Sequence, residues 1–199
     1  MSTKPEVFII ESLNPGDEGN GRFEGVLLSQ ILRLHKKEPK YRYVRTRKQF
    51  SKAIKEFGKS NYRYLHISAH GNRDGLCTTN LDDIDYSELA DLLAAHMDNR
   101  RLFISSCKMV HKSMAAAIIV KSGCLSVIGP TKKIKFSESA LVWASVYHLM
   151  FSTNQAAMSQ AVLLEKLRKV RALFKVPLAF FSTAKNNRGY TSDLLGDDL

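Results

Sequence analysis

A histidine and a cysteine each follow a stretch of strand-like sequence, and together they are able to perform nucleophilic chemistry. The stretch Tyr62–His70 runs into His70-Gly71, and the stretch Arg101–Cys107 ends in Cys107. If the two strands are neighbours in a sheet, about 4.8 Å apart, the imidazole and the thiol leave adjacent strand ends. A Cys–His dyad needs this proximity, because the thiolate is the nucleophile and the imidazole takes its proton. The pattern predicts catalytic roles for His70 and Cys107.

Gly71 fits the same prediction. A glycine lets the backbone turn sharply after His70, because it has no side chain. Its N–H can then point at a developing negative charge, alongside the N–H of Cys107. We therefore expect Gly71 and Cys107 to form an oxyanion hole.

Elements of strand character alternate along the chain with segments of helical periodicity. The six strand-like stretches are Val7–Ser12, Tyr41–Thr46, Tyr62–His70, Arg101–Cys107, Ser126–Pro130 and Pro177–Ser182. Short connections favour parallel pairing for at least the first four or five strands. We predict an α/β fold, a three-layer α/β/α sandwich around a six-stranded, mostly parallel sheet, with the chemistry at the carboxyl edge of the strands.

The segment between the first two strands has a helical pattern. Phe23, Leu27, Ile31 and Leu34 fall at i, i+4, i+8 and i+11. This spacing predicts a helix that packs these four side chains against the sheet.

Length and composition are those of a globular protein. With 199 residues, 44% of them hydrophobic, the chain is long enough for one sizeable core, and we expect a single domain over residues 1–199 with a flexible tail at 186–199. The longest apolar stretch, Ala140–Phe151, is too short to span a bilayer, and the amino-terminal apolar run is only four residues long. We therefore expect no signal peptide, no membrane contact and a cytoplasmic location.

Cysteine usage supports a reducing environment. The chain has three cysteines, an odd number without CxxC spacing, which argues against a disulfide framework and a structural zinc site. We expect Cys77 and Cys124 to be inert buried side chains, and His66 to be a core histidine.

The positive charge is concentrated in one segment. The net charge is 30 − 19 = +11, and Lys36–Arg63 contains eleven Lys or Arg and two Glu, or 11 − 2 = +9. Tyr41, Tyr43 and Tyr62 lie within this run. It predicts contact with nucleic acid or an acidic partner protein; a solvated surface is the other interpretation.

The strand ends together resemble the caspase-fold cysteine peptidases of clan CD, most of all the CHAT branch related to caspases and separase. The resemblance rests on Ser-Ala-His70-Gly71, Ser-Ser-Cys107 and Val127-Ile-Gly-Pro-Thr131, and covers the chain from Val7 to about Ser182. It implies a caspase-like fold in which Cys107 attacks a peptide carbonyl, His70 acts as base or ion-pair partner, and Gly71 helps to hold the oxyanion. It implies no metal or organic cofactor.

Two departures from caspases leave the substrate and the activation open. Lys108 follows the cysteine where caspases have arginine, and the spacing from His70 to Cys107, 107 − 70 = 37 residues, is shorter than the roughly 50 of caspases.

The resemblance implies a cysteine endopeptidase (a hydrolase) acting on a protein partner in stress, cell-death or defence signalling, with an activating or inhibitory partner protein. In this family the loop after the first strand and the segments around the catalytic strands line the first pocket, and their charge selects the residue before the scissile bond. The acidic residues in these segments are Asp17, Glu18, Asp74, Asp82, Asp83 and Asp85. We expect cleavage after a basic residue, with Asp17, Glu18, Asp74, Asp82 and Asp83 as candidate substrate-binding groups.

Three alternatives stay open. In the first, the chain is a catalytically idle module of the same fold that binds an acidic partner or nucleic acid through its basic face. His111, the histidine nearest to Cys107 in sequence, replaces His70 as the base. The segment Gly19–Gly25 cradles a phosphate between a strand and a helix, although its spacing is not GxGxxG.

Overall fold

The computed structural model describes residues 3–152 and 158–195. Its strands are β1 (Lys4–Ser12), β2 (Lys40–Tyr43), β3 (Tyr62–Gly71), β4 (Gly75–Cys77), β5 (Asp83–Asp85), β6 (Arg101–Ser105), β7 (Ser126–Pro130), β8 (Leu178–Thr183) and β9 (Tyr190–Leu195). Its helices are α1 (Pro15–Gly19), α2 (Glu24–Leu34), α3 (Arg47–Lys59), α4 (Tyr86–Leu93), α5 (Lys112–Ser122), α6 (Phe136–Phe151) and α7 (Gln160–Phe174).

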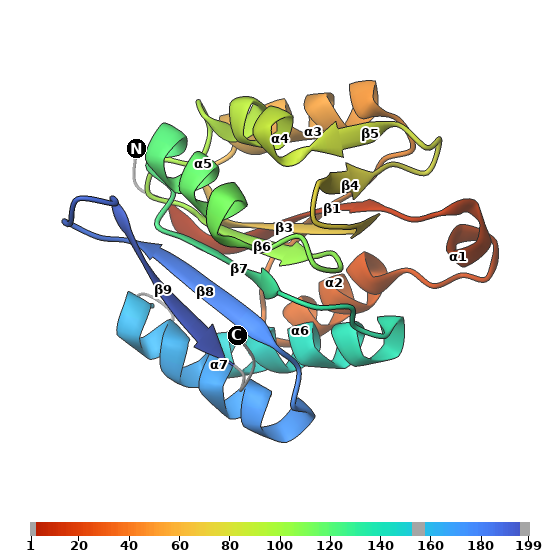
Figure 1. Cartoon of the computed structure of the whole chain (residues 1–199). Coiled ribbons are helices and arrows are strands. Elements are labelled where there is room, and N and C mark those ends of the chain that lie inside the picture. Colours follow the sequence, from red (N-terminus) through yellow and green to blue (C-terminus); the bar gives the residue numbers. More distant parts are fainter. Residues whose placement is uncertain (1–2, 153–157, 196–199) are drawn as a thin grey trace.

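The main sheet has the strand order β2-β1-β3-β6-β7-β8-β9. The first five strands along this order are parallel, and β8 and β9 are antiparallel to their neighbours. Figure 1 shows β1, β3, β6 and β7 running in the same direction, with α1 beyond their carboxyl ends. The predicted mostly parallel α/β sheet is confirmed. The prediction of six strands was too low, because the short hairpin strands β4 and β5 and the terminal strand β9 were missed.

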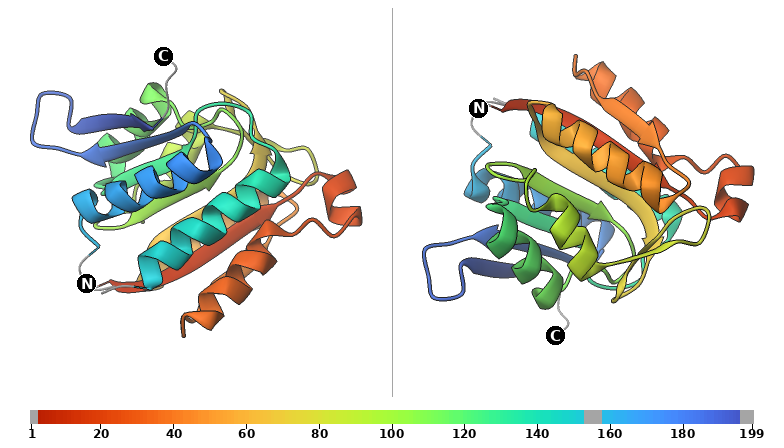
Figure 2. Two further views of the ribbon diagram at one scale, coloured as in Figure 1. Left: turned by 90° about the horizontal axis from the view of Figure 1, so that it is seen from below. Right: turned by 90° about the horizontal axis from the view of Figure 1, so that it is seen from above.

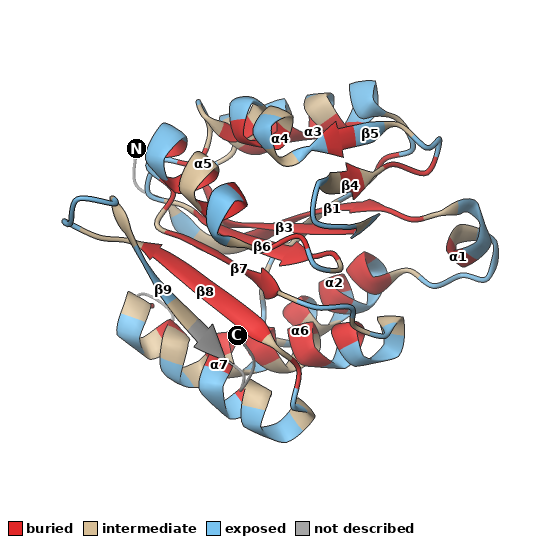
Figure 3. Cartoon of the chain, in the orientation of Figure 1, coloured by how far each residue is buried: buried red, intermediate tan, exposed pale blue. Residues whose placement is uncertain are grey.

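Helices cover both faces of the sheet, as Figure 2 shows from two sides. Helices α3, α4 and α5 pack on one face, and α2, α6 and α7 on the other. Side chains of a strand alternate between faces, so Phe8 and Ile10 of β1 join the first cluster and Val7 and Ile9 the second. Covering both faces explains why the central strands are nearly continuous apolar runs. Strands β1, β3, β6, β7 and β8 are buried along most of their length (Figure 3).

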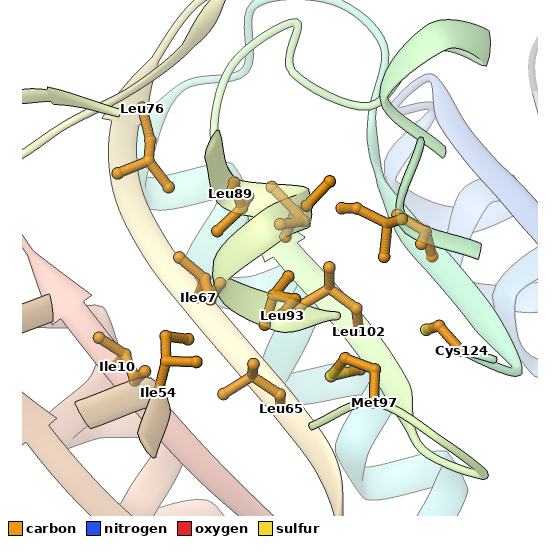
Figure 4. Close-up of a cluster of buried hydrophobic side chains, with 14 of the residues drawn as sticks. Ile10, Ile54, Leu65, Ile67, Leu76, Leu89, Leu93, Met97, Leu102 and Cys124 are labelled. Carbon is orange, nitrogen blue, oxygen red and sulfur yellow. The ribbon is translucent and has the colours of Figure 1, made fainter. Parts of the chain in front are cut away.

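The first cluster combines aliphatic side chains with the rings of Phe8, Phe50, Phe57, Tyr62 and Phe181. Ile67 of β3 and Leu102 of β6 lie opposite Leu89 and Leu93 of α4, with Cys124 at the far side of the same core (Figure 4). Burial raises the pKa of the Cys124 thiol to about 12. Cys124 is therefore held as an inert thiol.

Helix α2 buries a different face from the one predicted. Leu28 and Leu32 are fully buried, whereas Leu27 is 37% exposed and Leu34 is 80% exposed. A Cβ on Gly25 would lie 2.6 Å from the Tyr41 ring, so the helix approaches the sheet through this glycine. The predicted apolar stripe was wrong because the buried face also carries two polar side chains, Glu24 and Ser29.

The carboxyl-terminal segment was expected to be a flexible tail over residues 186–199. Within it, Tyr190–Leu195 form β9, which pairs with β8; residues 196–199 lie outside the described residues. Over the described ranges, 3–152 and 158–195, no helix has both the length and the apolar character needed to cross a membrane.

Candidate active site

The ends of β3 and β6 bring the predicted dyad to one place. Ser68 of β3 and Ser105 of β6 are partners in the parallel register, and His70 and Cys107 each follow two residues later. Both line a single cavity of about 320 Å³, whose wall is completed by the segment 133–136 and the loop after β1. The two side chains thus leave adjacent strand ends, as the sequence indicated, and their catalytic roles stay a prediction.

Cys107 is half-buried in a turn that the following segment holds in place. Its Sγ lies 3.6 Å from the Ile134 carbonyl oxygen, and the N–H of Lys108 donates to the Lys132 carbonyl at 3.4 Å. Lys108 has a φ of 59°, the left-handed conformation, so the chain turns sharply directly after the thiol. The Cys107 thiol thus lines the cavity at a sharp turn of the backbone.

His70 is held by an acid from the loop after β1. Its Nε2 lies 2.6 Å from Oδ2 of Asp17. The amide nitrogen of Asn14 lies 3.1 Å from the same Nε2, but a protonated Nε2 cannot accept from it, so the bond to Asp17 sets the tautomer. A neutral ring that donates from Nε2 to Asp17 carries its lone pair on Nδ1.

Asp17 is placed by helix α1. The Asn14 side chain accepts from the N–H of Asp17 at 2.7 Å and caps this helix, and Pro15 occupies its first turn. Arg22 donates to the other carboxylate oxygen at 2.8 Å. Burial alone would raise the pKa of Asp17, but the hydrogen bonds and positive charges of Arg22 and His70 outweigh it, and the pKa is lowered from its ordinary value. Asp17 is therefore a carboxylate at neutral pH.

Gly71 has no room for a side chain. A Cβ at this position would lie 2.2 Å from the Ser106 Oγ and 2.6 Å from the Gly75 carbonyl oxygen. Gly71 pairs with Leu76 of β4, so the β4–β5 hairpin presses against the strand end. The role of the Gly71 and Cys107 amides as an oxyanion hole stays a prediction.

The inner end of the cavity is polar and buried. Glu24 lines it while being only 1% exposed, together with Ser68, Ser105 and Ser139. Oε1 of Glu24 lies 3.3 Å from Nε2 of His66, whose Nδ1 lies 2.9 Å from the Tyr147 hydroxyl. The prediction that His66 is a core histidine agrees with its complete burial.

Sequence reasoning missed Glu24. The signal was present, because an acid at the first turn of a helix that leaves a strand end points toward the same edge as His70 and Cys107. It was overlooked because the helix was assigned the wrong buried face.

A second buried carboxylate, Glu11, supports the start of α2. It accepts from the N–H of Gly25 at 2.9 Å and from the Tyr41 hydroxyl at 2.7 Å. Burial raises its pKa to about 7, against the lowering effect of these two hydrogen bonds. This group fixes Glu24 in place through the neighbouring residue of the chain.

Most of the other predicted acidic groups lie elsewhere. Glu18, Asp74, Asp82 and Asp83 do not line the described wall of this cavity. Glu18 pairs with Arg45 at 3.2 Å, and Asp82 accepts from the backbone N–H of Arg47 at the start of α3. Asp74 and Asp83 line a separate hollow at the β4–β5 hairpin. Of the five predicted substrate-binding acids, the structure brings only Asp17 to the dyad.

His111, the alternative base, has a structural role, and Cys77, expected to be an inert buried side chain, is half-buried. His111 caps α5 with its Nδ1, and its Nε2 lies 2.9 Å from the Arg73 carbonyl oxygen. The pKa of the Cys77 thiol is raised by burial and by the neighbouring Asp83 carboxylate. Neither residue lines the cavity of His70 and Cys107 within the described structure.

The glycine segment differs from the alternative interpretation, and the predicted contact of the basic run with nucleic acid or an acidic partner stays a prediction. Residues Pro15–Gly19 are helical, and Gly25 is buried inside α2 against Tyr41, so Gly19–Gly25 is not an open phosphate loop. In the basic run, Lys37, Arg42, Arg45 and Arg47 form ion pairs with carboxylates. Among residues 3–152 and 158–195, no group of three or more His, Cys, Asp or Glu side chains is arranged to hold a metal ion.

Comparison with known proteins finds similarity of structure only. No family model matches the chain, and no curated protein matches it. A secreted C11 cysteine protease from Bacteroides thetaiotaomicron, solved with an irreversible peptide inhibitor, superposes with a TM-score of 0.59 at 10% identity, covering 90% of this chain and 66% of that one. The Arg-specific cysteine proteinase gingipain R superposes with a TM-score of 0.56 at 11% identity, covering 88% of this chain and 44% of that one.

The chain has a caspase-like fold. A complex of the pro- and mature domains of Porphyromonas gingivalis RgpB gives the same result, with a TM-score of 0.56 at 12% identity. It covers 86% of this chain and 44% of the RgpB chain. The chain spans less than two thirds of the length of each of these three proteins.

Proposed function

We propose that the chain is a cysteine endopeptidase that cleaves a protein partner after a basic residue. The observation that carries the proposal is one cavity that holds His70 and Cys107 at its mouth and the buried carboxylate of Glu24 at its inner end. The proposed nucleophile, base and specificity group thereby line the same cavity.

The dyad accounts for each proton in the reaction. His70 takes the thiol proton of Cys107, and the thiolate attacks the scissile carbonyl, giving a tetrahedral oxyanion that the Gly71 and Cys107 amides stabilise. The imidazolium returns the proton to the leaving amine as the C–N bond breaks, which leaves an acyl-enzyme. Water then attacks the thioester with His70 as base, releasing the carboxylic acid and the free thiol. Asp17 holds Nε2 and stabilises the imidazolium in both steps.

The charge of the cavity favours a basic residue before the scissile bond. Glu24 is buried, and within the described residues His66 is the one hydrogen-bond partner of its carboxylate. A lysine ammonium or an arginine guanidinium that enters the cavity would replace lost hydration by a charge-assisted hydrogen bond to this carboxylate. The Arg-specific neighbour gingipain R supports the same preference by its fold.

We further propose that the chain is most similar to the CHAT branch of the caspase-fold peptidases and that it acts in the cytoplasm. We propose a role in stress, cell-death or defence signalling with a regulatory partner protein. These assignments rest on the strand-end motifs and the cysteine usage of the sequence. The idle interaction module, with binding through Lys36–Arg63, is the competing function.

Two measurements test the proposal. The first is the alkylation rate of each cysteine by iodoacetamide against pH, followed by mass spectrometry in the wild type and in His70→Ala. We expect Cys107 to be alkylated at pH values well below ~8.5, the pKa of a free thiol, and to lose this reactivity in the variant. Cys77 and Cys124 are the internal controls. Equal reactivity of the three thiols would favour the idle module.

The second measurement is hydrolysis of peptides that differ only at one residue, Arg, Lys, Leu or Asp. We expect cleavage after Arg or Lys and none by Cys107→Ala. Salt-sensitive binding of nucleic acid that survives Cys107→Ala, without any cleavage by the wild type, would support the module instead.

A further inference from the structure

The segment that follows β7 places two lysines at the mouth of the cavity. Lys133 and Lys135 both line it, one on each side of Ile134, and both are exposed. Within the described chain neither ammonium forms an ion pair with a carboxylate, unlike Arg22, which is paired with Asp17. The mouth of the cavity therefore has the opposite charge from its inner end.

The backbone around these lysines is fixed next to the nucleophile. The Ile134 carbonyl contacts the Cys107 Sγ, and the Lys132 carbonyl accepts from the N–H of Lys108. At the two ends of the segment, the backbone N–H of Thr131 donates to the Pro177 carbonyl and the backbone N–H of Lys135 donates to the Glu138 carboxylate. A peptide whose scissile carbonyl reaches Cys107 therefore comes close to this segment.

The nearby acids do not cancel this charge. Asp17 is neutralised by Arg22 and His70, and Glu24 lies at the buried inner end. Glu138 is held at the backbone of Lys135 and does not line the described cavity. The two lysines are left as the charges that face a bound peptide beside its basic residue.

We infer that Lys133 and Lys135 form a subsite for an acidic side chain, so that the preferred substrate carries Asp or Glu close to the basic residue at the cut. The inference rests on the proposed function and refines its substrate class. The basic side chain enters the cavity toward Glu24, and the neighbouring acidic side chain stays at the mouth between the two ammonium groups. A substrate with basic residues on both sides of the cut is disfavoured by the same charges.

The test uses pairs of fluorogenic peptides with a common Arg, in which one neighbouring position is Glu or Gln. With Glu at each of the three positions on either side of the cut in turn, we expect kcat/KM to be about fivefold higher than with Gln at one or more of them. The advantage is expected to shrink between about 0.05 M and about 0.5 M salt, because the ion pairs are exposed.

Charge reversal assigns the effect to the two lysines. In Lys133→Glu and Lys135→Glu we expect the Glu preference to disappear and a Lys preference to replace it at the same position. Lys55→Glu, on α3 and away from the cavity lining, changes the net charge equally and is the matched control. We expect its Glu-to-Gln ratio to equal that of the wild type.

The outcomes separate the inference from the proposed function. Equal rates for Glu and Gln peptides, or an equal change in Lys55→Glu, with cleavage after Arg intact, would overturn the acidic subsite alone. Absence of cleavage of every peptide by an enzyme whose Cys107 is also unreactive would overturn the proposed function and the subsite with it.

Discussion

Strand β3 carries two histidine–carboxylate pairs that share one chemistry and differ in surroundings. His66 and Glu24 are 0% and 1% exposed, with 3.3 Å between Nε2 and Oε1, whereas the His70 and Asp17 side chains are 45% and 11% exposed, with 2.6 Å between Nε2 and Oδ2. The two histidines are four residues apart on the strand and lie on the same face. The buried pair is enclosed by the aromatic rings of Trp143 and Tyr147, and the exposed pair opens to the cavity.

The difference shows how burial divides the two roles. An imidazole that exchanges protons with a substrate needs access to the cavity, and His70 has it. The buried pair cannot lose a partner without leaving a polar group unpaired in the core. We therefore expect the exposed pair to control the rate, and the buried pair to control stability and substrate choice.

The largest effect is expected at His70. In His70→Ala the thiol of Cys107 loses its base, and we expect kcat/KM to fall by about 1,000-fold, with the urea midpoint of unfolding nearly unchanged. Peptide hydrolysis and urea unfolding of the same preparation check this. A loss of stability equal to that of a core variant would contradict the division of roles.

His66→Leu is expected to act in the opposite way. It leaves the Glu24 carboxylate and the Tyr147 hydroxyl without their shared partner, so we expect the free energy of unfolding to fall by about 3 kcal/mol. Urea unfolding at neutral pH measures it. A variant that is stable but inactive would show that His66 acts in catalysis and not in stability.

Glu11→Gln sharpens the comparison within the buried region. The folded-state pKa of Glu11 is raised by burial from 4.5 to about 7, so its contribution to stability is complete below about pH 4.5 and is lost as the pH rises through about 7. Gln resembles the protonated acid, and we expect the variant to be more stable than the wild type by up to about 3 kcal/mol at about pH 8, with no difference near pH 4. Unfolding curves across this range test it; parallel curves would be the contrary result.

Glu24→Gln separates substrate choice from folding. Gln keeps an oxygen to accept from His66, so we expect stability to change little. The variant lacks the negative charge that would pair with a basic substrate side chain, so we expect kcat/KM for a peptide with Arg before the scissile bond to fall about 30-fold. For a peptide with an uncharged residue at that position, we expect no fall. Equal losses for both peptides would show that Glu24 positions the site without selecting the side chain.

Asp17→Asn is expected to have the smallest effect. His70 keeps a hydrogen-bond partner but loses the charge that stabilises its imidazolium, so we expect kcat/KM to fall about tenfold. Since Asp17 has a lowered pKa, the wild type keeps this support down to acidic pH, and the variant's rate profile is expected to shift along the pH axis. A fall in rate with an unchanged profile would indicate a purely structural role.

Much of the fold and half of the site follow from sequence. The strand-like runs are apolar because helices cover both faces, so β1, β3, β6, β7 and β8 could be predicted from these local apolar runs. Chain order then places His70 and Cys107 at one sheet edge. The hairpin strands β4 and β5 are three residues each, too short to give a periodic signal.

The other half of the site depends on contacts that periodicity does not reveal. Glu24 and Ser29 occupy the buried face of α2, where a hydrophobicity pattern expects apolar side chains. Asp17 was predicted as one of several loop acids; its bond to His70 depends on the fold of α1. Acidic residues such as Glu18 and Asp82 have the same sequence signature as Asp17 but pair with Arg45 and the start of α3.

Helix α1 has a consequence for heat tolerance. With five residues it is shorter than any helix that is stable in isolation, and it persists through the Asn14 cap and the ion pairs of Asp17 and Glu18. Such a segment opens locally at a lower free energy than the core. We therefore expect the fraction of molecules in which Asp17 contacts His70 to fall on warming before the sheet unfolds, so that any activity that depends on this contact is lost at a lower temperature than the fold.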